Sequence, residues 1–161
     1  MKENICVREI AAPKEKTALA RAILEGLPDW FGIPEAREEY IQNSASELFF
    51  AAFEGEAPVG FLTLKPTGEA TAELAVMGVR KERHRQGVGR ALFEAAKARA
   101  KALGYVFLQV KTVQMGRYPE YDATNRFYLA LGFREFEVFP TLWDEWNPCQ
   151  IYVMYLGETH G

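Results

Sequence analysis

Residues 83–92 have the sequence RHRQGVGRAL and join a predicted strand to a predicted helix. The strand is the apolar run at residues 72–79, and the helix is the alanine- and leucine-rich segment at residues 88–103. The first N–H groups of a helix lack intrahelical acceptors and lie at the positive end of its dipole, so they attract anions. Glycines let a ligand approach the backbone closely, and neighbouring arginines add charge. We therefore expect this loop to hold a phosphorylated ligand.

The length of 161 residues predicts one domain, residues 1–161, which is long enough to build a hydrophobic core. A net charge of −3 gives no reason to expect binding to nucleic acid or to an anionic membrane. Cys6 and Cys149 lie far apart and show no metal-ligand spacing, so no metal site is expected. Because the sequence shows no signal peptide and no long apolar span, we expect a cytoplasmic protein.

Turn residues divide the chain into short segments with the periodicity of strands or helices. This order of segments predicts an α/β fold in which helices cover a mixed sheet. The polar segments at residues 114–121 and 140–148 are predicted to be loops. The predicted helices are residues 14–27, 34–43, 88–103 and 123–131, and the predicted strands are residues 5–10, 48–54, 58–65, 72–79, 105–112, 135–139 and 150–156.

Two common phosphate-binding loops do not fit residues 83–92. A P-loop needs the pattern G-x-x-x-x-G-K-[ST], and neither its spacing nor its Lys-Ser/Thr pair is present. A dinucleotide-binding loop needs G-x-G-x-x-G, but Leu92 stands where the third glycine belongs. That loop also opens an N-terminal βαβ unit, whereas this one follows a series of predicted hairpin strands.

A third kind of loop fits better. Residues 84–89, HRQGVG, resemble the acyl-coenzyme A loop of the GNAT superfamily of N-acetyltransferases, whose pattern is Gln/Arg-x-x-Gly-x-Gly/Ala; His84 departs from it at the first position. Residues 127–133, FYLALGF, resemble the second signature of that superfamily. The resemblance implies a single-domain, mixed and mostly antiparallel sheet flanked by helices. It also implies that the protein uses acetyl-CoA to acetylate a primary amine of a small molecule or protein, by direct attack on the thioester.

The resemblance assigns the coenzyme to the end of the strand and to the loop. The pantetheine arm would pair with the strand near Gly78, a residue that suggests a bulge, a close backbone approach or, alternatively, close packing. The side chains of Arg80, Lys81 and Arg83 are expected to form a solvated face. The residues expected to bind the coenzyme are Met77, Gly78, Val79, His84, Arg85, Gln86, Gly87, Val88, Gly89, Arg90 and Asn125.

Two residues are candidates for the catalytic proton transfers. In the superfamily, the tyrosine at the position of Tyr128 can protonate the departing thiolate. The alternative is a core tyrosine beside Phe127 on an amphipathic helix. Some members carry a catalytic glutamate at the position of Glu73, which starts the apolar strand at residues 72–79 and would accept the proton of the amine. The alternative is a glutamate that faces solvent at the end of the strand.

The acceptor is the least determined part of the prediction. Relatives bind acceptors beside their early helices and their last hairpin, which here carry Trp30, Phe31 and Trp143. Aromatic rings next to acids can bind a cationic amine, but these rings could equally seal the core or a dimer contact. Dimers are common among the relatives, so the resemblance also suggests a homodimer.

Two other functions compete with the enzyme. One is a non-catalytic module that binds coenzyme A and senses its acyl state; Tyr128 and the intact Gly-x-Gly pattern argue against it. The other is a nucleic-acid-binding protein that uses the basic residues 80–90, which the acidic chain and the lack of stacking aromatic residues there disfavour.

Overall fold

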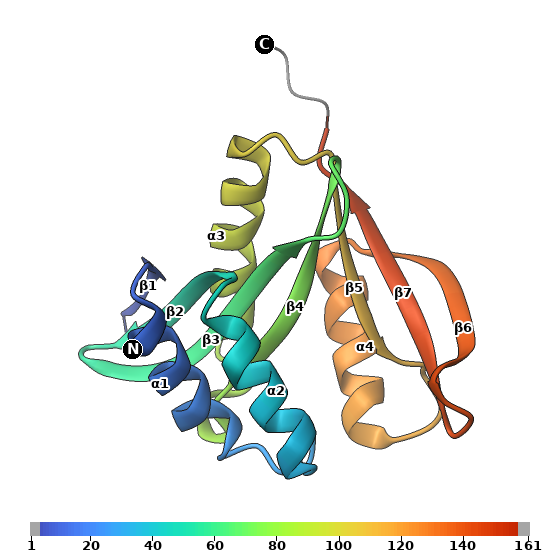
Figure 1. Ribbon diagram of the computed structural model, residues 1–161, viewed down its shortest axis with the longest axis horizontal. Helices are drawn as coiled ribbons and strands as arrows, with labels where there is room; N and C mark the ends of the chain where they lie inside the picture. The colour runs from blue at the N-terminus through green and yellow to red at the C-terminus, as the bar shows by residue number, and fades with distance from the viewer. Residues whose placement is uncertain (1–3, 158–161) are drawn as a thin grey trace. The chain divides into compact units, whose positions relative to one another are not determined.

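The computed structural model describes residues 4–157 (Figure 1). The chain divides into two compact units. The first unit comprises Met1–Lys65 and Ala75–Arg99, and the second comprises Pro66–Leu74 and Ala100–Gly161. The elements are β1 (Ile5–Ile10), α1 (Pro13–Leu24), α2 (Pro34–Ser44), β2 (Leu48–Glu54), β3 (Ala57–Pro66), β4 (Thr71–Val79), the 3-10 helix η1 (Lys81–Arg83), α3 (Val88–Ala102), β5 (Phe107–Val113), α4 (Pro119–Leu131), β6 (Arg134–Asp144) and β7 (Asn147–Tyr155).

Seven strands form a sheet in the order β1-β2-β3-β4-β5-β7-β6. The pair β4–β5 is parallel over Thr71–Leu74, whereas β1–β2, β2–β3, β5–β7 and β6–β7 are antiparallel. Strand β4 contributes its first half to the second unit and its second half to the first. The mixed, mostly antiparallel sheet with flanking helices is therefore confirmed, while the single domain over residues 1–161 stays a prediction. None of the helices within residues 4–157 is long and apolar enough to cross a membrane.

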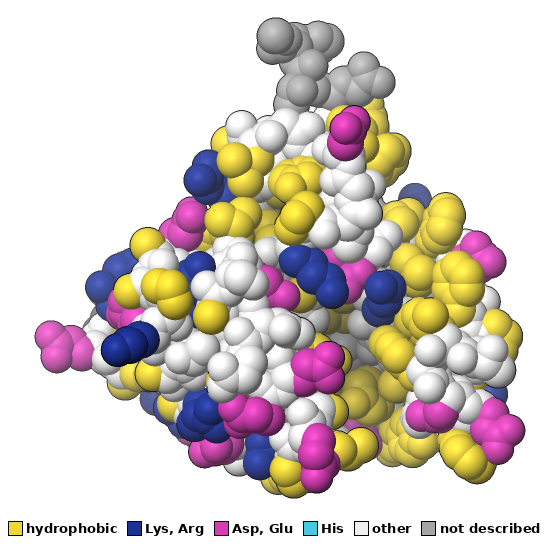
Figure 2. All heavy atoms as spheres, viewed as in Figure 1, with side chains coloured by type: hydrophobic (Ala, Val, Ile, Leu, Met, Phe, Trp, Pro, Cys, Tyr) yellow, Lys and Arg dark blue, Asp and Glu magenta, His cyan; other side chains and the backbone are white. Residues whose placement is uncertain are grey.

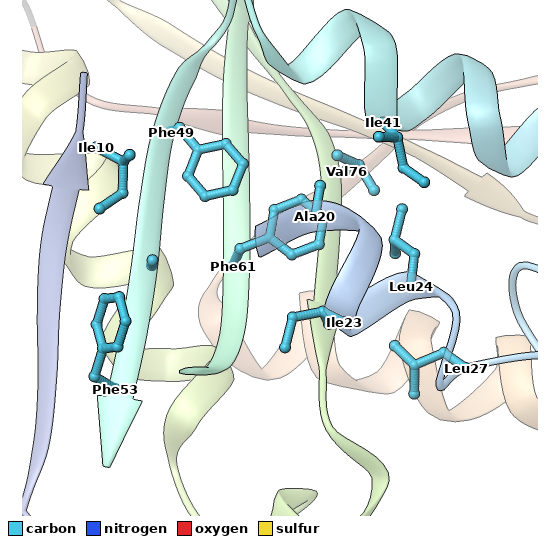
Figure 3. Close-up of a cluster of buried hydrophobic side chains, with 11 residues drawn as sticks. Ile10, Ala20, Ile23, Leu24, Leu27, Ile41, Phe49, Phe53, Phe61 and Val76 are labelled. Atoms are coloured by element: carbon cyan, nitrogen blue, oxygen red, sulfur yellow. The ribbon is translucent and has the colours of Figure 1, made fainter. Parts of the chain in front are cut away.

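Helix α1 and the strands of the first unit share one hydrophobic core (Figure 3). Figure 3 shows the α1 side chains Ala20, Ile23 and Leu24 beside Phe61 and Val76 of the sheet. These α1 positions recur every three or four residues, so the apolar stripe that the sequence predicts is the face that packs. Helix α2 closes the cluster with Ile41, which is fully buried.

Two helix boundaries differ from the prediction by more than one residue. Helix α1 ends at Leu24 rather than at residue 27, because Gly26 and Leu27 donate to the carbonyl groups three residues before them, which tightens the last turn. Helix α4 begins at Pro119 rather than at residue 123. Proline has no N–H to leave unsatisfied and its φ suits the first turn of a helix, while Glu120 and Asp122 favour the positive end of the dipole.

The predicted loop at residues 140–148 is wrong, because β6 and β7 continue through it as one hairpin. Asp144 holds the turn: its Oδ1 accepts hydrogen bonds from the backbone N–H groups of Trp146 and Asn147, each at 2.9 Å. Pro140 lies inside β6, where a proline is tolerated because β6 is the edge strand and its pairing is irregular between Phe139 and Asp144.

Asn125 ties α4 to the strands of the second unit. It is fully buried, and its Nδ2 donates to the carbonyl oxygens of Val113 at 2.8 Å and Tyr121 at 2.7 Å. Its Oδ1 accepts a hydrogen bond from the Tyr152 hydroxyl on β7 at 2.5 Å. All the polar atoms of the amide are therefore used inside the protein, as buried polar groups require.

We predict that Tyr152→Phe lowers the free energy of unfolding by about 1–3 kcal/mol, because Asn125 Oδ1 then stays buried without a donor. Chemical denaturation measures the change. Tyr155→Phe is the matched control, since Tyr155 lies on the same strand with 61% of its surface exposed. Equal losses in the two variants would contradict a specific role for the Tyr152–Asn125 hydrogen bond.

Candidate active site

The loop between β4 and α3 presents backbone N–H groups to solvent. Arg85 and Gly87 adopt the left-handed conformation, with φ of +65° and +83°. Arg85, Gln86 and Gly87 are exposed, and the backbone N–H of Ala91 donates to the carbonyl oxygen of Gly87 at 3.0 Å. The N–H groups of Val88 and Gly89 lie at the very start of α3, where helix geometry offers no intrahelical acceptor, and N–H groups in that position can bind phosphate.

Two of the three basic residues before this loop, Arg80 and Arg83, hold it in place, whereas Lys81 is exposed, as expected for a solvated face. Arg83 makes a two-pronged ion pair with Glu54 of β2, with nitrogen–oxygen distances of 2.6 and 2.9 Å. Arg80 donates from Nε to the carbonyl of Pro58 at 2.7 Å. Lys81 pairs with Asp29 at 3.2 Å, although its side chain remains largely exposed. Arg85 and Arg90 are the exposed cations next to the glycines.

The structure shows the contacts of the His84 side chain, whose role the sequence did not predict. Its Nε2 lies 2.7 Å from the carbonyl oxygen of Val79, so this nitrogen carries a hydrogen and donates it. The ring also meets Trp30 edge to face, with centroids 5.4 Å apart. His84 thus fastens the loop to the end of β4 and to the turn that follows α1.

Gly78 is a site of close packing. A Cβ atom there would lie 3.0 Å from Ile23, 3.2 Å from Leu27 and 3.3 Å from Leu24, all on or next to α1. This contact favours the packing alternative for the glycine. Pairing of a pantetheine arm with the backbone of residues 77–79 stays a prediction.

Glu73 is buried, with 7% of its side chain exposed, so it is not a glutamate that faces solvent. Its Oε1 accepts a hydrogen bond from Gln109 Nε2 at 2.7 Å and lies 3.2 Å from Lys111 Nζ. The sequence analysis missed both partners. Side chains alternate along β5, so residues 109 and 111 lie on the same face of the sheet. This pattern could have predicted that both contact Glu73, but only if the pairing of β5 with β4 had been known.

Tyr128 is 6% exposed and packs against the rings of Phe133 and Tyr152, at centroid distances of 5.8 and 6.3 Å. This burial fits a core tyrosine and also an acid kept from bulk water, so the catalytic assignment stays a prediction. Asn125, expected at the coenzyme, instead uses its side chain within the fold. No described contact of Asn125 points to a ligand.

The aromatic residues considered for the acceptor differ in exposure. Trp30 and Phe31 are partly buried against the core of the first unit. Trp143 lies on the β6–β7 hairpin and is 45% exposed. Figure 2 shows hydrophobic side chains gathered on the visible surface over β6 and β7. The other large exposed apolar side chains of β6, β7 and their turn are Phe136, Leu142, Trp146 and Tyr155.

Cys149 lies near Glu73 and Lys111 but is unsuited to nucleophilic chemistry. It is fully buried, and burial is the main cause that raises the pKa of its thiol to about 11. The Glu73 carboxylate raises the pKa further, whereas Lys111 lowers it. The thiol therefore stays protonated at neutral pH, and the thiolate is the form that attacks.

Comparisons with known proteins identify a family and a fold. The sequence matches the model of the acetyltransferase (GNAT) family over residues 17–133. No curated protein sequence matches the chain.

Solved structures show the same fold. A GNAT-family protein from Desulfovibrio desulfuricans has a TM-score of 0.80 at 21% identity, with 96% of this chain and 100% of that chain covered. An aminoglycoside 6'-N-acetyltransferase complexed with coenzyme A has a TM-score of 0.76 at 16% identity, with 97% and 99% covered. The ribosomal-protein-S18-alanine N-acetyltransferase from Escherichia coli has a TM-score of 0.75 at 18% identity, with 98% and 97% covered.

We predict that iodoacetamide at pH 8 labels Cys6, which is exposed, and leaves Cys149 unlabelled. A thiol with a pKa of about 11 loses its proton only as the pH approaches that value, so roughly one Cys149 in a thousand is a thiolate at pH 8. Peptide mass spectrometry measures the labelling, and denatured protein, in which both thiols react, is the control. Equal labelling of both residues in the native protein would refute the assignment.

Proposed function

Because the chain belongs to the acetyltransferase (GNAT) family, we propose that it transfers the acetyl group of acetyl-CoA to a primary amine. The observation that supports the proposal is the loop before α3, where the start of the helix, the left-handed Gly87 and the exposed Arg85 and Arg90 lie together and would form an anion site. A pyrophosphate suits this site, since it needs several N–H donors and positive charge close together. Acetyl-CoA is the acetyl donor of the family and carries that group.

The donor would lie along residues 77–79 and 84–90. In this proposal, the amides of Gly87, Val88 and Gly89 bind the pyrophosphate, and Arg85 and Arg90 add charge. Gln86 is exposed between two left-handed residues and can reach the same phosphates. His84 would act by holding the loop, because its Nε2 is already bonded to Val79.

The reaction we propose is a single displacement. The neutral amine attacks the thioester carbonyl carbon, a C–N bond forms, and the C–S bond breaks as coenzyme A leaves. Glu73 would take the proton that the amine gives up, and Tyr128 would give a proton to the departing thiolate. Gln109 and Lys111 both contact Glu73 Oε1 and would keep its carboxylate in a fixed orientation.

Direct attack is favoured over an acetyl-cysteine intermediate. Cys149 is fully buried with a raised pKa, so it offers no thiolate to receive the acetyl group. Cys6 is exposed but lies on β1, a strand with no other candidate catalytic residue. Transfer from coenzyme to amine without a covalent enzyme intermediate is the simpler route with these residues.

The acceptor is proposed only as a primary amine. The compared structures include an enzyme named for an aminoglycoside and one named for a protein alanine, so the fold serves unlike acceptors. Trp30, Phe31 and Trp143 remain the proposed acceptor residues, because their rings can pack against an alkyl chain or a cation. A homodimer and a cytoplasmic location remain expectations from the sequence.

A non-catalytic coenzyme A sensor is the alternative, and turnover separates the two functions. We predict that the protein releases coenzyme A thiol from acetyl-CoA in the presence of at least one amine from a panel of polyamines, aminoglycosides and peptides. A thiol reagent measures the release, and mass spectrometry measures the acetylated amine. Coenzyme A binding without turnover across the panel would favour the sensor, and absence of binding would refute both functions.

We predict that Tyr128→Phe lowers turnover by at least about tenfold while the dissociation constant for coenzyme A changes by less than about threefold. The phenyl ring preserves the packing against Phe133 and Tyr152 and removes only the hydroxyl that would protonate the thiolate. Tyr118→Phe, at an exposed position just before α4, is the control and should keep full turnover. Unchanged turnover in Tyr128→Phe would remove the catalytic assignment.

A further inference from the structure

Two side-chain contacts join the loop before α3 to the turn between α1 and α2. Lys81 Nζ lies 3.2 Å from Asp29 Oδ2, and the His84 ring meets Trp30 edge to face at 5.4 Å. The members of the first pair are 52 residues apart in sequence, so the fold brings the two segments together. Both contacts involve consecutive residues of the turn and the short segment that enters the loop.

The contact between His84 and Trp30 links the loop to the turn more firmly than the ion pair between Lys81 and Asp29 does. Lys81 and Asp29 are both more than half exposed, so solvent screens their attraction and the side chains can move apart. The Trp30 side chain packs against the core cluster, and its backbone N–H donates to the carbonyl oxygen of Leu27, which follows the end of α1, at 3.2 Å. A shift of the His84 ring therefore displaces a side chain that is anchored in the core.

His84 also lies next to the residues whose conformation a ligand bound to the loop would stabilise. It precedes Arg85, whose φ of +65° is unfavourable for a residue with a side chain. An anion bound to the following amides would stabilise that conformation further, whereas the empty loop keeps it through the contacts of Arg80, Arg83 and His84 alone. The free energy of the conformation around His84 thus differs between the occupied and the empty loop. A ligand can shift a conformational equilibrium only through such a difference.

We propose that His84 is a positioning residue that couples occupancy of the loop by the coenzyme pyrophosphate to the conformation of the turn at residues 29–33. The proposal rests on the function proposed above. The turn carries Trp30 and Phe31, the residues proposed to contact the acceptor. Through His84, occupancy of the loop would therefore set the position of these two rings.

Trp30 itself can report the coupling. The chain has three tryptophans, and Trp143→Phe with Trp146→Phe leaves Trp30 as the only one. Both replaced residues are exposed, so the background variant is expected to fold. Titration with coenzyme A should change the Trp30 emission with the same dissociation constant that calorimetry measures on the same protein.

Substitutions in this background separate the ring from its hydrogen bond. His84→Asn removes the ring, and at saturating coenzyme A it should abolish most of the Trp30 response. His84→Phe keeps a ring and should retain part of the response, while Lys81→Gln removes only the exposed ion pair and should retain nearly all of it. Hydrogen exchange of residues 27–37 in the unmodified protein gives a second measure, and coenzyme A should slow it.

The outcomes distinguish this inference from the proposed function. Absence of coenzyme A binding in calorimetry would overturn the proposed function and this inference with it. Binding without a Trp30 response and without slower exchange at residues 27–37 would overturn the coupling alone. A full response in His84→Asn would show that His84 is not the residue that transmits it.

Discussion

The N–H groups at the start of α3 can face a ligand only while the preceding residues hold an unfavourable backbone conformation. For Arg85 that conformation is unfavourable by roughly 1–2 kcal/mol, so it persists only where other contacts fix the chain. The ion pair of Arg83 with Glu54 and the hydrogen bond of Arg80 fix it on one side. His84 fixes it on the other. The basic character of this segment therefore serves the shape of the loop as well as its charge.

Packing in the core of the first unit also fixes the position of the end of β4, from which the loop begins. Gly78 lets α1 approach β4 so closely that a Cβ atom would lie 3.0 Å from Ile23. Gly60 on β3 repeats the pattern, because a Cβ atom there would lie 3.0 Å from the carbonyl oxygen of Gly78. The end of β4 is thus positioned by helix packing on one face and by the neighbouring strand, and the loop begins from a strand end that has little freedom to move.

The sequence predicted the parts of the molecule in which local pattern and tertiary structure agree. The apolar strand β4, the glycine loop and α3 have clear periodicity and turn residues, and all three are where we expected them. Pro140 misled the prediction of β6, because only the sheet order shows that the strand lies at an edge. Glu73, Asn125 and His84 were selected by type and position, and their predicted roles toward a ligand stay predictions. Their partners come from strands and turns distant in sequence, so no local pattern could give them.

Strand β6 carries several features that keep an exposed edge from adding further strands. Pro140 offers no N–H, the pairing shifts near Glu135 and again beyond Phe139, and acidic side chains repeat along the strand. Because of these features, β6 lacks the regular row of backbone N–H and C=O groups with which another strand would pair in amyloid-like stacking. The hairpin can therefore expose Trp143 and Trp146 without turning the sheet edge into a template for aggregation. A second copy that docks on this hairpin would have to do so through side chains, and the two sheets would stay separate.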